Sequence, residues 1–234
     1  MALPFFYIEN YTGEKQVMLN EDTSRHVVQV LRMKTGEQLN LTDGKGYLLS
    51  CEILEANKKH CVVNVIGSRF RSHASRNITI AISLLKNANR FEWFLEKATE
   101  IGVSEIIPLI CERTEKEKFR YDRMQGICIS AMLQSQQCWL PILHESTRFE
   151  DVVMKRFENG RKFIAHCVEG DKASLHNLQI NTSSNLQILI GPEGDFVPAE
   201  IELALLNQFV PVSLGETRLR TETAGIVAAT LLCL

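Results

Sequence analysis

Hydrophobic and polar positions change their spacing about a third of the way along the 234-residue chain. The first part contains short runs of β-branched and aromatic residues separated by turn-forming residues, a pattern that predicts β-strands. We expect these strands over residues 5–8, 16–19, 37–43, 47–56 and 61–67. Residues 22–31 have apolar positions at helical spacing and predict one helix among them. This part of the chain is therefore expected to be a small β-rich module.

From residue 77 onward, apolar runs alternate with longer stretches of helical periodicity, which is typical of an α/β sheet with mostly parallel strands. The expected strands cover 78–85, 105–110, 163–167, 186–191 and 210–214. The expected helices cover 88–101, 121–138, a segment that opens at Pro198, and 221–233. Residues 68–76 are polar, basic and without periodicity, so we interpret them as a linker. The boundary then separates a domain of residues 1–72 from one of residues 73–234.

Amino-acid composition excludes several classes of protein. With 45% hydrophobic and 23% charged residues, the chain is that of an ordinary globular protein. Its formal net charge of −2 argues against a protein that coats nucleic acid by bulk charge. Residues 1–76 nevertheless carry ten Lys and Arg against eight Asp and Glu, so the overall charge does not exclude a basic surface on this part of the chain. The apolar runs are too short for a membrane helix and the N-terminus lacks a signal-peptide pattern, so we expect a cytoplasmic protein without a membrane partner.

The cysteines and histidines do not predict a metal site. The seven cysteines are an odd number and form no CxxC pair, and the six histidines show no ligand spacing. We therefore expect no disulfide framework, no bound metal and mostly buried thiols. Cys167 lies near the loops described next, but no neighbour in the sequence is expected to activate it as a catalytic thiol.

One segment departs from the pattern of a buried core. Gly191-Pro192-Glu193-Gly194-Asp195-Phe196 follows an apolar strand and precedes the helix at Pro198. Glycines permit close approach of the backbone to a ligand, and the N–H groups at a helix N-terminus favour an electron-rich group. The segment is thus a candidate binding loop. The alternative is a tight strand-to-helix connection that binds nothing.

A second unusual segment begins at Leu214 and runs into the final helix. Arg218 and Arg220 lie where open α/β sheets bind ligands, although a solvated, salt-bridged loop is the alternative for both. Thr221 is a candidate N-cap, and Glu222 falls in the first turn, where the helix dipole favours a carboxylate. Small residues follow that permit close packing by a neighbour: Ala224, Gly225, Ala228 and Ala229.

The two segments GPEGDF and LGETRLRTETAG, separated by residues 197–213, resemble the knot loops of SPOUT-class RNA methyltransferases. More narrowly, the whole chain resembles the ribosomal RNA small-subunit methyltransferase E family, which methylates N3 of a uridine in 16S rRNA. Other matching segments are His26, Val30-Leu31-Arg32, Gly36, Asp43-Gly44-Lys45-Gly46, residues 97–103 and Glu112-Arg113-Thr114. Ser130 and Gln137 depart from the family, which more commonly has Glu and Arg there, and we assign them no role.

The resemblance implies an α/β fold with a PUA-like RNA-binding β-barrel over residues 1–72. Residues 73–234 would form a SPOUT methyltransferase domain with a C-terminal trefoil knot, a rare exception to the rule against knotted chains. It also implies S-adenosylmethionine as cofactor and a homodimer, in which we expect helix 221–233 to pack at the interface. The implied cofactor-binding residues are His166, Cys167, Ile190, Gly191, Pro192, Glu193, Gly194, Leu214, Gly215, Leu219, Arg220, Thr223 and Ala224.

Methylation of uridine N3 requires loss of its proton, for which a cation over the base or a carboxylate base is needed. Arg220 is our candidate for the cation, with Arg218 second, and Glu193 and Glu222 are candidate carboxylates for which a local structural role is favoured. The predicted RNA-binding residues are Arg25, His26, Arg32, Lys34 and Lys45, with Tyr47 available for stacking. The expected partner is 16S rRNA in the small ribosomal subunit. Two alternatives are an enzyme of the same class that acts on another RNA such as tRNA, and a non-catalytic RNA-binding or ribosome assembly factor.

Overall fold

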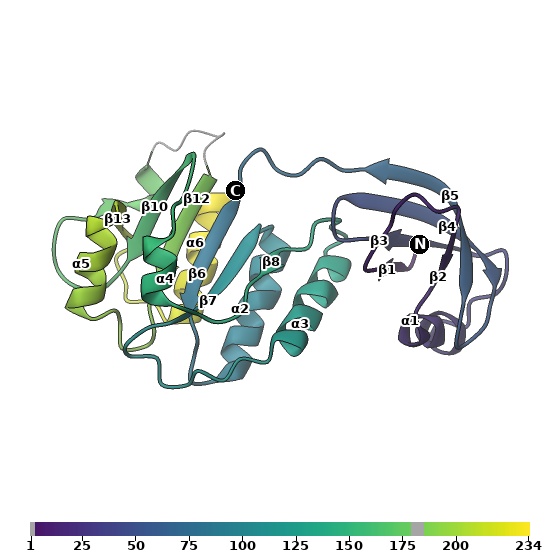
Figure 1. The fold of residues 1–234 in the computed structure, drawn as a ribbon, viewed down its shortest axis with the longest axis horizontal. Coiled ribbons are helices and arrows are strands. Elements are labelled where there is room, and N and C mark those ends of the chain that lie inside the picture. Colours follow the sequence, from purple (N-terminus) through teal and green to yellow (C-terminus); the bar gives the residue numbers. More distant parts are fainter. Residues whose placement is uncertain (1–2, 179–184) are drawn as a thin grey trace. The chain divides into compact units, whose positions relative to one another are not determined.

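The computed structural model describes residues 3–178 and 185–234, which divide into two compact units (Figure 1). The first unit contains the chain up to His73 together with Met132–Leu140. The second contains Ala74–Ala131 and Pro141–Leu234. The chain therefore leaves the first unit, enters the second, and returns briefly to the first before it completes the second.

The first unit is built on a mostly antiparallel sheet in the order β1-β3-β4-β5-β2. Its strands are β1 (Phe5–Tyr7), β2 (Gln16–Met18), β3 (Gln38–Thr42), β4 (Tyr47–Glu55) and β5 (Val62–Phe70). Alternate side chains of a strand point to opposite faces, and on β4 Leu49, Cys51 and Ile53 are fully buried in the core of this unit. The structure thus confirms the β-rich module.

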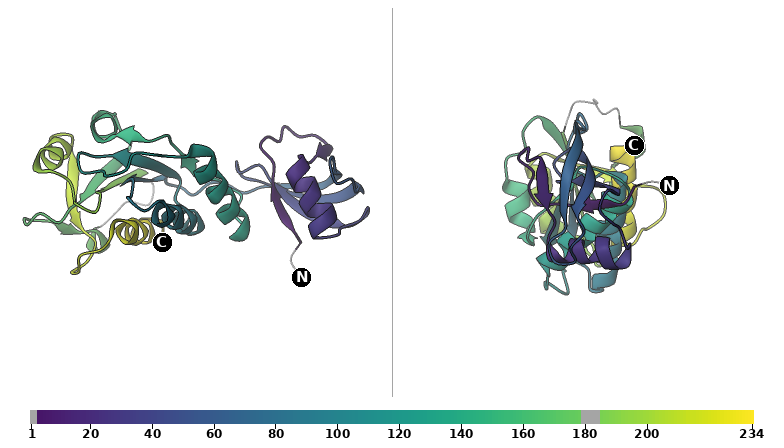
Figure 2. Two further views of the ribbon diagram at one scale, coloured as in Figure 1. Left: turned by 90° about the horizontal axis from the view of Figure 1, so that it is seen from below. Right: turned by 90° about the vertical axis from the view of Figure 1, so that its right-hand side faces the viewer.

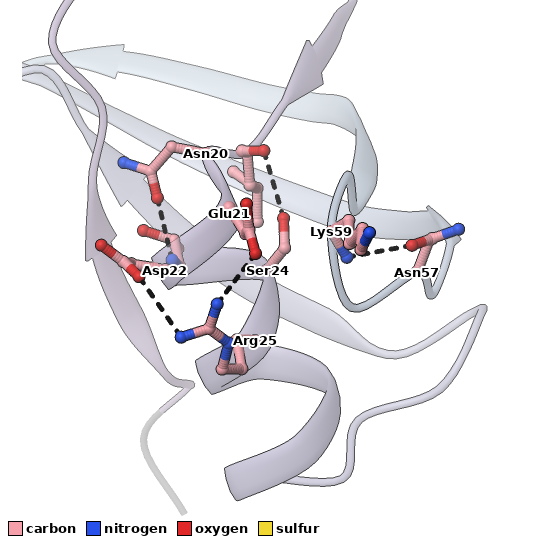
Figure 3. A network of polar contacts seen from close by, with 9 residues as sticks. Asn20, Glu21, Asp22, Ser24, Arg25, Asn57 and Lys59 are labelled. Carbon is pink, nitrogen blue, oxygen red and sulfur yellow. Dashed lines mark hydrogen bonds and ion pairs between the residues drawn. The ribbon is translucent and has the colours of Figure 1, made fainter.

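The helix of the first unit differs from the sequence prediction. It begins as α1 (Glu21–Arg25) and continues as a π-helical turn, η1 (His26–Val30). Asn20 is the N-cap, and its side-chain oxygen accepts a hydrogen bond of 2.8 Å from Thr23 N–H (Figure 3). The wider turn is closed by a hydrogen bond from Leu31 N–H to His26 O.

The second unit contains a sheet in the order β11-β13-β10-β12-β6-β7-β8, and β9 also pairs with β7. Its strands are β6 (Ile78–Ser83), β7 (Glu105–Ile110), β8 (Ile142–Leu143), β9 (Thr147–Arg148), β10 (Gly160–Ala165), β11 (Ala173–Ser174), β12 (Asn185–Ile190) and β13 (Phe209–Ser213). Within the described residues, every pairing of these strands is parallel. Strand β6 is buried along its whole length, as expected for a central strand covered on both faces.

Helices cover both faces of this sheet (Figures 1 and 2). On one face lie α2 (Ala88–Ile101) and α6 (Thr221–Cys233), which pack against each other. On the other lie α4 (Phe149–Met154) and α5 (Pro198–Leu206). The chain also forms α3 (Tyr121–Gln134) and a short 3-10 turn, η2 (Leu175–Asn177). None of the helices in the described residues combines the length and apolar character needed to cross a membrane.

The chain crosses back over itself after β13. This strand lies on one side of β10, yet α6 packs against β12 and β6 on the other side. Such a return crossing is what a knotted SPOUT-type domain requires. Because β10, β12 and β13 are parallel and in register, the loops after them meet at one edge of the sheet.

Two boundaries predicted from the sequence are wrong. The helix expected over 121–138 ends at Gln134, and Gln136 adopts a positive φ of 55°. The following residues instead pair with the first unit, where Gly46 N–H donates to Cys138 O and Leu140 N–H donates to Gly44 O. The linker expected over 68–76 begins later, because β5 extends through Phe70.

The final helix also differs from expectation at its start and on its packed face. Arg220 holds the N-cap position without a side-chain hydrogen bond, and Thr221 is the first helical residue. Ala228 and Ala229 are fully buried, and a Cβ added to Gly225 would lie 2.7 Å from Phe94 Cε2. Gly225, Ala228 and Ala229 therefore pack against α2 and the sheet of their own unit, whereas Ala224 is only half-buried.

Candidate active site

Two adjoining cavities open at the edge of the sheet where β10, β12 and β13 end. Their volumes are about 390 and about 310 Å³, within the range of about 300 to 1,000 Å³ usual for small-molecule sites. Residues common to both linings are Ala165, Cys167, Arg218, Leu219 and Ala224. The three loops after these strands thus surround one continuous candidate site.

Most of the residues predicted to bind cofactor line these cavities. The first cavity includes His166, Cys167, Leu214, Gly215, Leu219 and Ala224. The second includes Ile190, Gly191, Pro192, Glu193 and Arg220. Neither lining contains Gly194 or Thr223. Residues that the sequence interpretation missed are Ala165, Lys172, Val212, Ser213, Glu216, Thr217, Asp195 and Thr221.

Contacts from other loops hold the Gly191–Gly194 loop in place. Lys86 N–H donates to Glu193 Oε1 over 3.3 Å, and Arg113 Nη1 donates to Gly194 O over 2.6 Å. A Cβ at Gly194 would lie 3.2 Å from Arg113 Cδ, tighter than most real contacts. Gly194 therefore serves the site by admitting the Arg113 side chain, which explains why it is absent from the cavity linings.

Asp195 joins two of the three loops. Its Oδ2 accepts a hydrogen bond of 2.9 Å from Cys167 N–H, which links the loop after β12 to the loop after β10. Its backbone has a positive φ of 64°, a conformation that Asp tolerates better than most residues. The only signal in the sequence was an Asp next to Gly194, which does not reveal the distant partner.

His166 contributes an uncharged polar ring to the first cavity. Burial, followed by the nearby Lys172 ammonium, lowers the pKa of His166, and Asp195 opposes this shift. The Nδ1 atom is buried without a hydrogen-bond partner among the described residues. Lys172 Nζ donates to His166 O over 2.9 Å and fixes the backbone of this loop. A neutral imidazole with an unpaired ring nitrogen fits a site for a polar ligand.

The glycine in the loop after β13 leaves room beside the first cavity. Gly215 has a φ of +152°, and a Cβ added there would meet no atom within 4 Å. By contrast, a Cβ at Gly191 would lie 3.1 Å from the Phe196 ring. Gly215 therefore keeps space open for a ligand, whereas Gly191 also allows the loop to pack on Phe196.

The candidate catalytic residues do not all reach the cavities. Arg218 lines both and Arg220 lines the second, as does Glu193. The Glu222 side chain is only 8% exposed and lies 3.6 Å from Arg90 Nε through its Oε1. Because Glu222 belongs to neither lining, its contact with α2 supports the structural role that was favoured for it.

The residues predicted to bind RNA come from two segments of the first unit, one before β3 and one after it. Arg25 and His26 belong to α1 and η1, and Arg25 forms ion pairs with Glu21 and Asp22 (Figure 3). Arg32 and Lys34 follow η1. Lys45 lies beyond the opposite end of β3, in the turn to β4.

The cysteines follow the expected pattern. Cys51, Cys61, Cys111, Cys128 and Cys138 are buried and carry free thiols, whereas Cys167 is exposed. Burial raises the pKa of Cys111 to about 12. In the part of the chain that the structure describes, no three His, Cys, Asp or Glu side chains gather as metal ligands.

Comparison with known proteins identifies the fold and the family. Residues 72–233 match the RNA methyltransferase domain family, and residues 19–66 match the RNA methyltransferase PUA domain family. The structure is similar to that of a probable rRNA-methyltransferase from Porphyromonas gingivalis, with a TM-score of 0.91, 38% identity and coverage of 98% of this chain and 97% of that chain. For a ribosomal RNA small subunit methyltransferase E from Neisseria gonorrhoeae bound to S-adenosyl methionine, the TM-score is 0.88 at 28% identity, with coverage of 99% and 97%. The ribosomal RNA small subunit methyltransferase E of Rickettsia conorii is 28% identical over 228 residues, which cover 95% of this chain and 91% of that protein.

The fold and the loops around the cavities define a SPOUT-type RNA methyltransferase domain joined to a PUA-like β half-barrel. This confirms the fold class predicted from the two motif loops. The chain belongs to the ribosomal RNA small subunit methyltransferase E family.

Proposed function

We propose that this chain transfers the methyl group of S-adenosylmethionine to N3 of a uridine in the 16S rRNA of the small ribosomal subunit. The observation that carries this proposal is the convergence of the GPEGDF and LGETRLRTETAG segments on one pair of adjoining cavities. The related protein from Neisseria gonorrhoeae, which is similar over nearly the whole chain, is bound to S-adenosyl methionine.

The residues of the cavities suit this cofactor. The space beside Gly215 admits a ligand close to the backbone, so that peptide N–H and C=O groups of the loop after β13 can bind an adenine edge. His166 offers a neutral ring, which avoids repulsion of a cationic ligand. When bound, S-adenosylmethionine supplies an electrophilic methyl group on a sulfonium. The chain's own task is then to orient the uridine and to help remove its N3 proton.

We propose that Arg220 stabilises the uridine anion. It lines the second cavity and occupies the N-cap position of α6, where the helix dipole adds to its positive field. A guanidinium over a uracil oxygen favours loss of the N3 proton because it stabilises the charge that develops there. Arg218 is the second candidate. Of the two candidate glutamates, Glu193 lines the second cavity, where it accepts from Lys86 N–H, while Glu222 supports the start of α6 through Arg90.

RNA contact by the first unit and assembly as a homodimer complete the proposal. Arg32, Lys34 and Lys45 are the cations most available to RNA phosphates, since Arg25 is engaged by two carboxylates. We propose that His26 contacts RNA beside them. Methylation of another RNA such as tRNA, or assembly of the ribosome without catalysis, would replace this function if the purified chain did not modify small subunits.

Substitution of Arg220 tests the catalytic assignment. Arg220→Ala is expected to lower the single-turnover rate at saturating RNA and cofactor about 10² to 10³-fold, the usual cost of losing one preorganised donor. Arg220→Lys should recover only part of the rate because an ammonium lacks the planar two-pronged donor. Arg156→Ala is the matched control, since Arg156 is 88% exposed and lies outside both cavity linings.

The same experiment separates a catalytic from a structural role. Thermal melts of the variants show whether Arg220→Ala changes the rate without changing stability. A variant that melts normally and methylates at the parental rate would move the assignment to Arg218 or Glu193. Mass spectrometry of rRNA nucleosides from a deletion strain, with and without the restored gene, identifies the methylated base.

A further inference from the structure

Five aromatic side chains form a continuous row in the first unit. Successive ring centroids are 5.5 Å apart between Tyr11 and Tyr47, 5.3 Å between Tyr47 and Phe70, and 5.9 Å between Phe70 and Trp139. His73 ends the row, 4.7 Å from Trp139. All four contacts are edge-to-face. We call these residues the aromatic row. Trp139 comes from the segment that returns to this unit, so no continuous stretch of sequence contains the row.

The backbone at Gly46 fixes the contact between Phe70 and Trp139 within the aromatic row. A Cβ added to Gly46 would lie 2.7 Å from both Phe70 Cε2 and Trp139 Cζ2, so only glycine lets the two rings approach. Gly46 adopts a positive φ of 106°, and its carbonyl accepts from Arg71 N–H. Trp139 Nε1 donates to Arg71 O over 2.9 Å, which satisfies the indole donor. These contacts hold the Phe70 and Trp139 rings in place, and the Trp139 N–H does not require another partner.

The aromatic row combines an exposed ring with positive charge. Phe70 is 55% exposed, so part of its ring is accessible to a ligand. Arg71 follows it directly, and Lys45 forms an isolated strand bridge with Trp139. The Asp43 carboxylate of the same turn does not face solvent. Asp43 is 3% exposed, and its side chain accepts hydrogen bonds from the N–H groups of Lys45 and Tyr47. Arg71 itself lies on the other face, where it lines a small cavity with Phe5 and Leu48 and donates to Gln136 O over 3.2 Å. The exposed cation in the turn beside the ring is therefore Lys45.

We propose that the exposed ring of the aromatic row, Phe70 beside Trp139, is a stacking site for an unpaired base of RNA, with Lys45 contacting an adjoining phosphate. Rigid rings bind bases through their π-faces, and flanking cations bind the backbone. Bases within a duplex are already stacked, so the site selects a single-stranded segment. The stacking site rests on the proposed function in one respect, which is that the substrate is RNA. It adds which kind of RNA segment the first unit recognises.

Phe70→Leu tests the stacking site because leucine keeps an apolar contact with Gly46 and Trp139 but lacks a π-face. The full-length chain without cofactor is titrated into fluorescent octauridine and into a short RNA duplex, and anisotropy is measured. Phe70→Leu is expected to weaken octauridine binding about tenfold, within the range for loss of one stacked base, and to leave duplex binding unchanged. Ile66→Ala is the matched control, since Ile66 lies on the same strand and is 48% exposed.

The salt dependence of RNA affinity distinguishes the contribution of the Phe70 ring from that of positive charge. Lys45→Gln should reduce the slope of log affinity against log salt by about one phosphate contact, whereas Phe70→Leu should leave the slope unchanged. The stacking site is overturned if Phe70→Leu binds octauridine as the parent does, if duplex binding falls equally, if Ile66→Ala has the same effect, or if the parent does not bind octauridine. The proposed function is judged separately, by methylation of small ribosomal subunits.

Discussion

Asp195 shows how a single residue can connect loops that lie far apart in the sequence. Its carboxylate accepts from Cys167 N–H and its backbone has a φ of 64°. Asp195→Gly suits this backbone but removes the acceptor. We expect an unchanged or higher melting temperature together with about tenfold weaker binding of S-adenosylmethionine, the order of loss for a hydrogen bond to a charged group. Calorimetry beside a thermal melt measures both.

Two further variants define this effect. Asp195→Asn retains a side-chain oxygen and should bind the cofactor more tightly than Asp195→Gly. Gln208→Gly is the matched backbone control, because Gln208 has a φ of 66° and lines neither cavity. Equal cofactor affinity of Asp195→Gly and the parent would show that the link between the two loops does not shape the site.

His166 should make stability dependent on pH. Its pKa lies below the ordinary value of about 6.5 in the folded chain, so the unfolded chain binds a proton first as the pH falls. The free energy of unfolding should therefore decrease below about pH 6.5 and continue to decrease until the folded pKa is reached. Urea unfolding at pH 7.5 and 5.5 should show a smaller decrease for His166→Gln than for the parent. His60→Gln is the control at an exposed position, and an identical decrease in all three proteins would contradict the assignment.

At the scale of elements, replacing glycine by alanine should have opposite effects on stability in two helices. Gly225 of α6 lies against Phe94 and Ile82, whose nearest atoms would be 2.7 and 2.8 Å from an added Cβ. Gly225→Ala should destabilise the chain by about 1 to 3 kcal/mol through overpacking. Gly126 of α3 is exposed and has open space, so Gly126→Ala should stabilise the chain by about 0.5 to 1 kcal/mol through helix propensity. Denaturant unfolding of both variants checks the opposite signs, and destabilisation by Gly126→Ala would refute this account of α3.

At the scale of the whole molecule, the chain cannot be divided at a single point without cost. Residues 77–234 include Met132–Leu140, whose partners Gly44, Gly46 and Arg71 are then absent. We expect this truncated chain to bind S-adenosylmethionine as the full chain does, to lose most RNA affinity, and to associate through the uncovered Trp139. Light scattering should fall when Trp139→Ser is introduced into the truncated chain. Methylation of small subunits at the full-length rate would show that the first unit is not needed for RNA recognition.

The sequence by itself determined the local elements and the general place of the site. Continuous apolar runs predicted β6 and β12, and helical spacing predicted α2, because the period of burial depends only on neighbouring residues. The motif loops could be placed at one edge of the sheet because parallel strands end together there. The short strands β8 and β9 carry too few residues for a periodic signal, and they were not predicted.

Only the tertiary structure decided which distant residues meet. The contacts of Glu222 with Arg90, of Asp195 with Cys167 and of Trp139 with Phe70 each join segments separated by many residues. Neither propensity nor periodicity encodes such pairs, since both describe only the local chain. The return of Met132–Leu140 to the first unit has the same cause: hydrogen bonds to a turn far earlier in the sequence end a helix that local pattern would have continued.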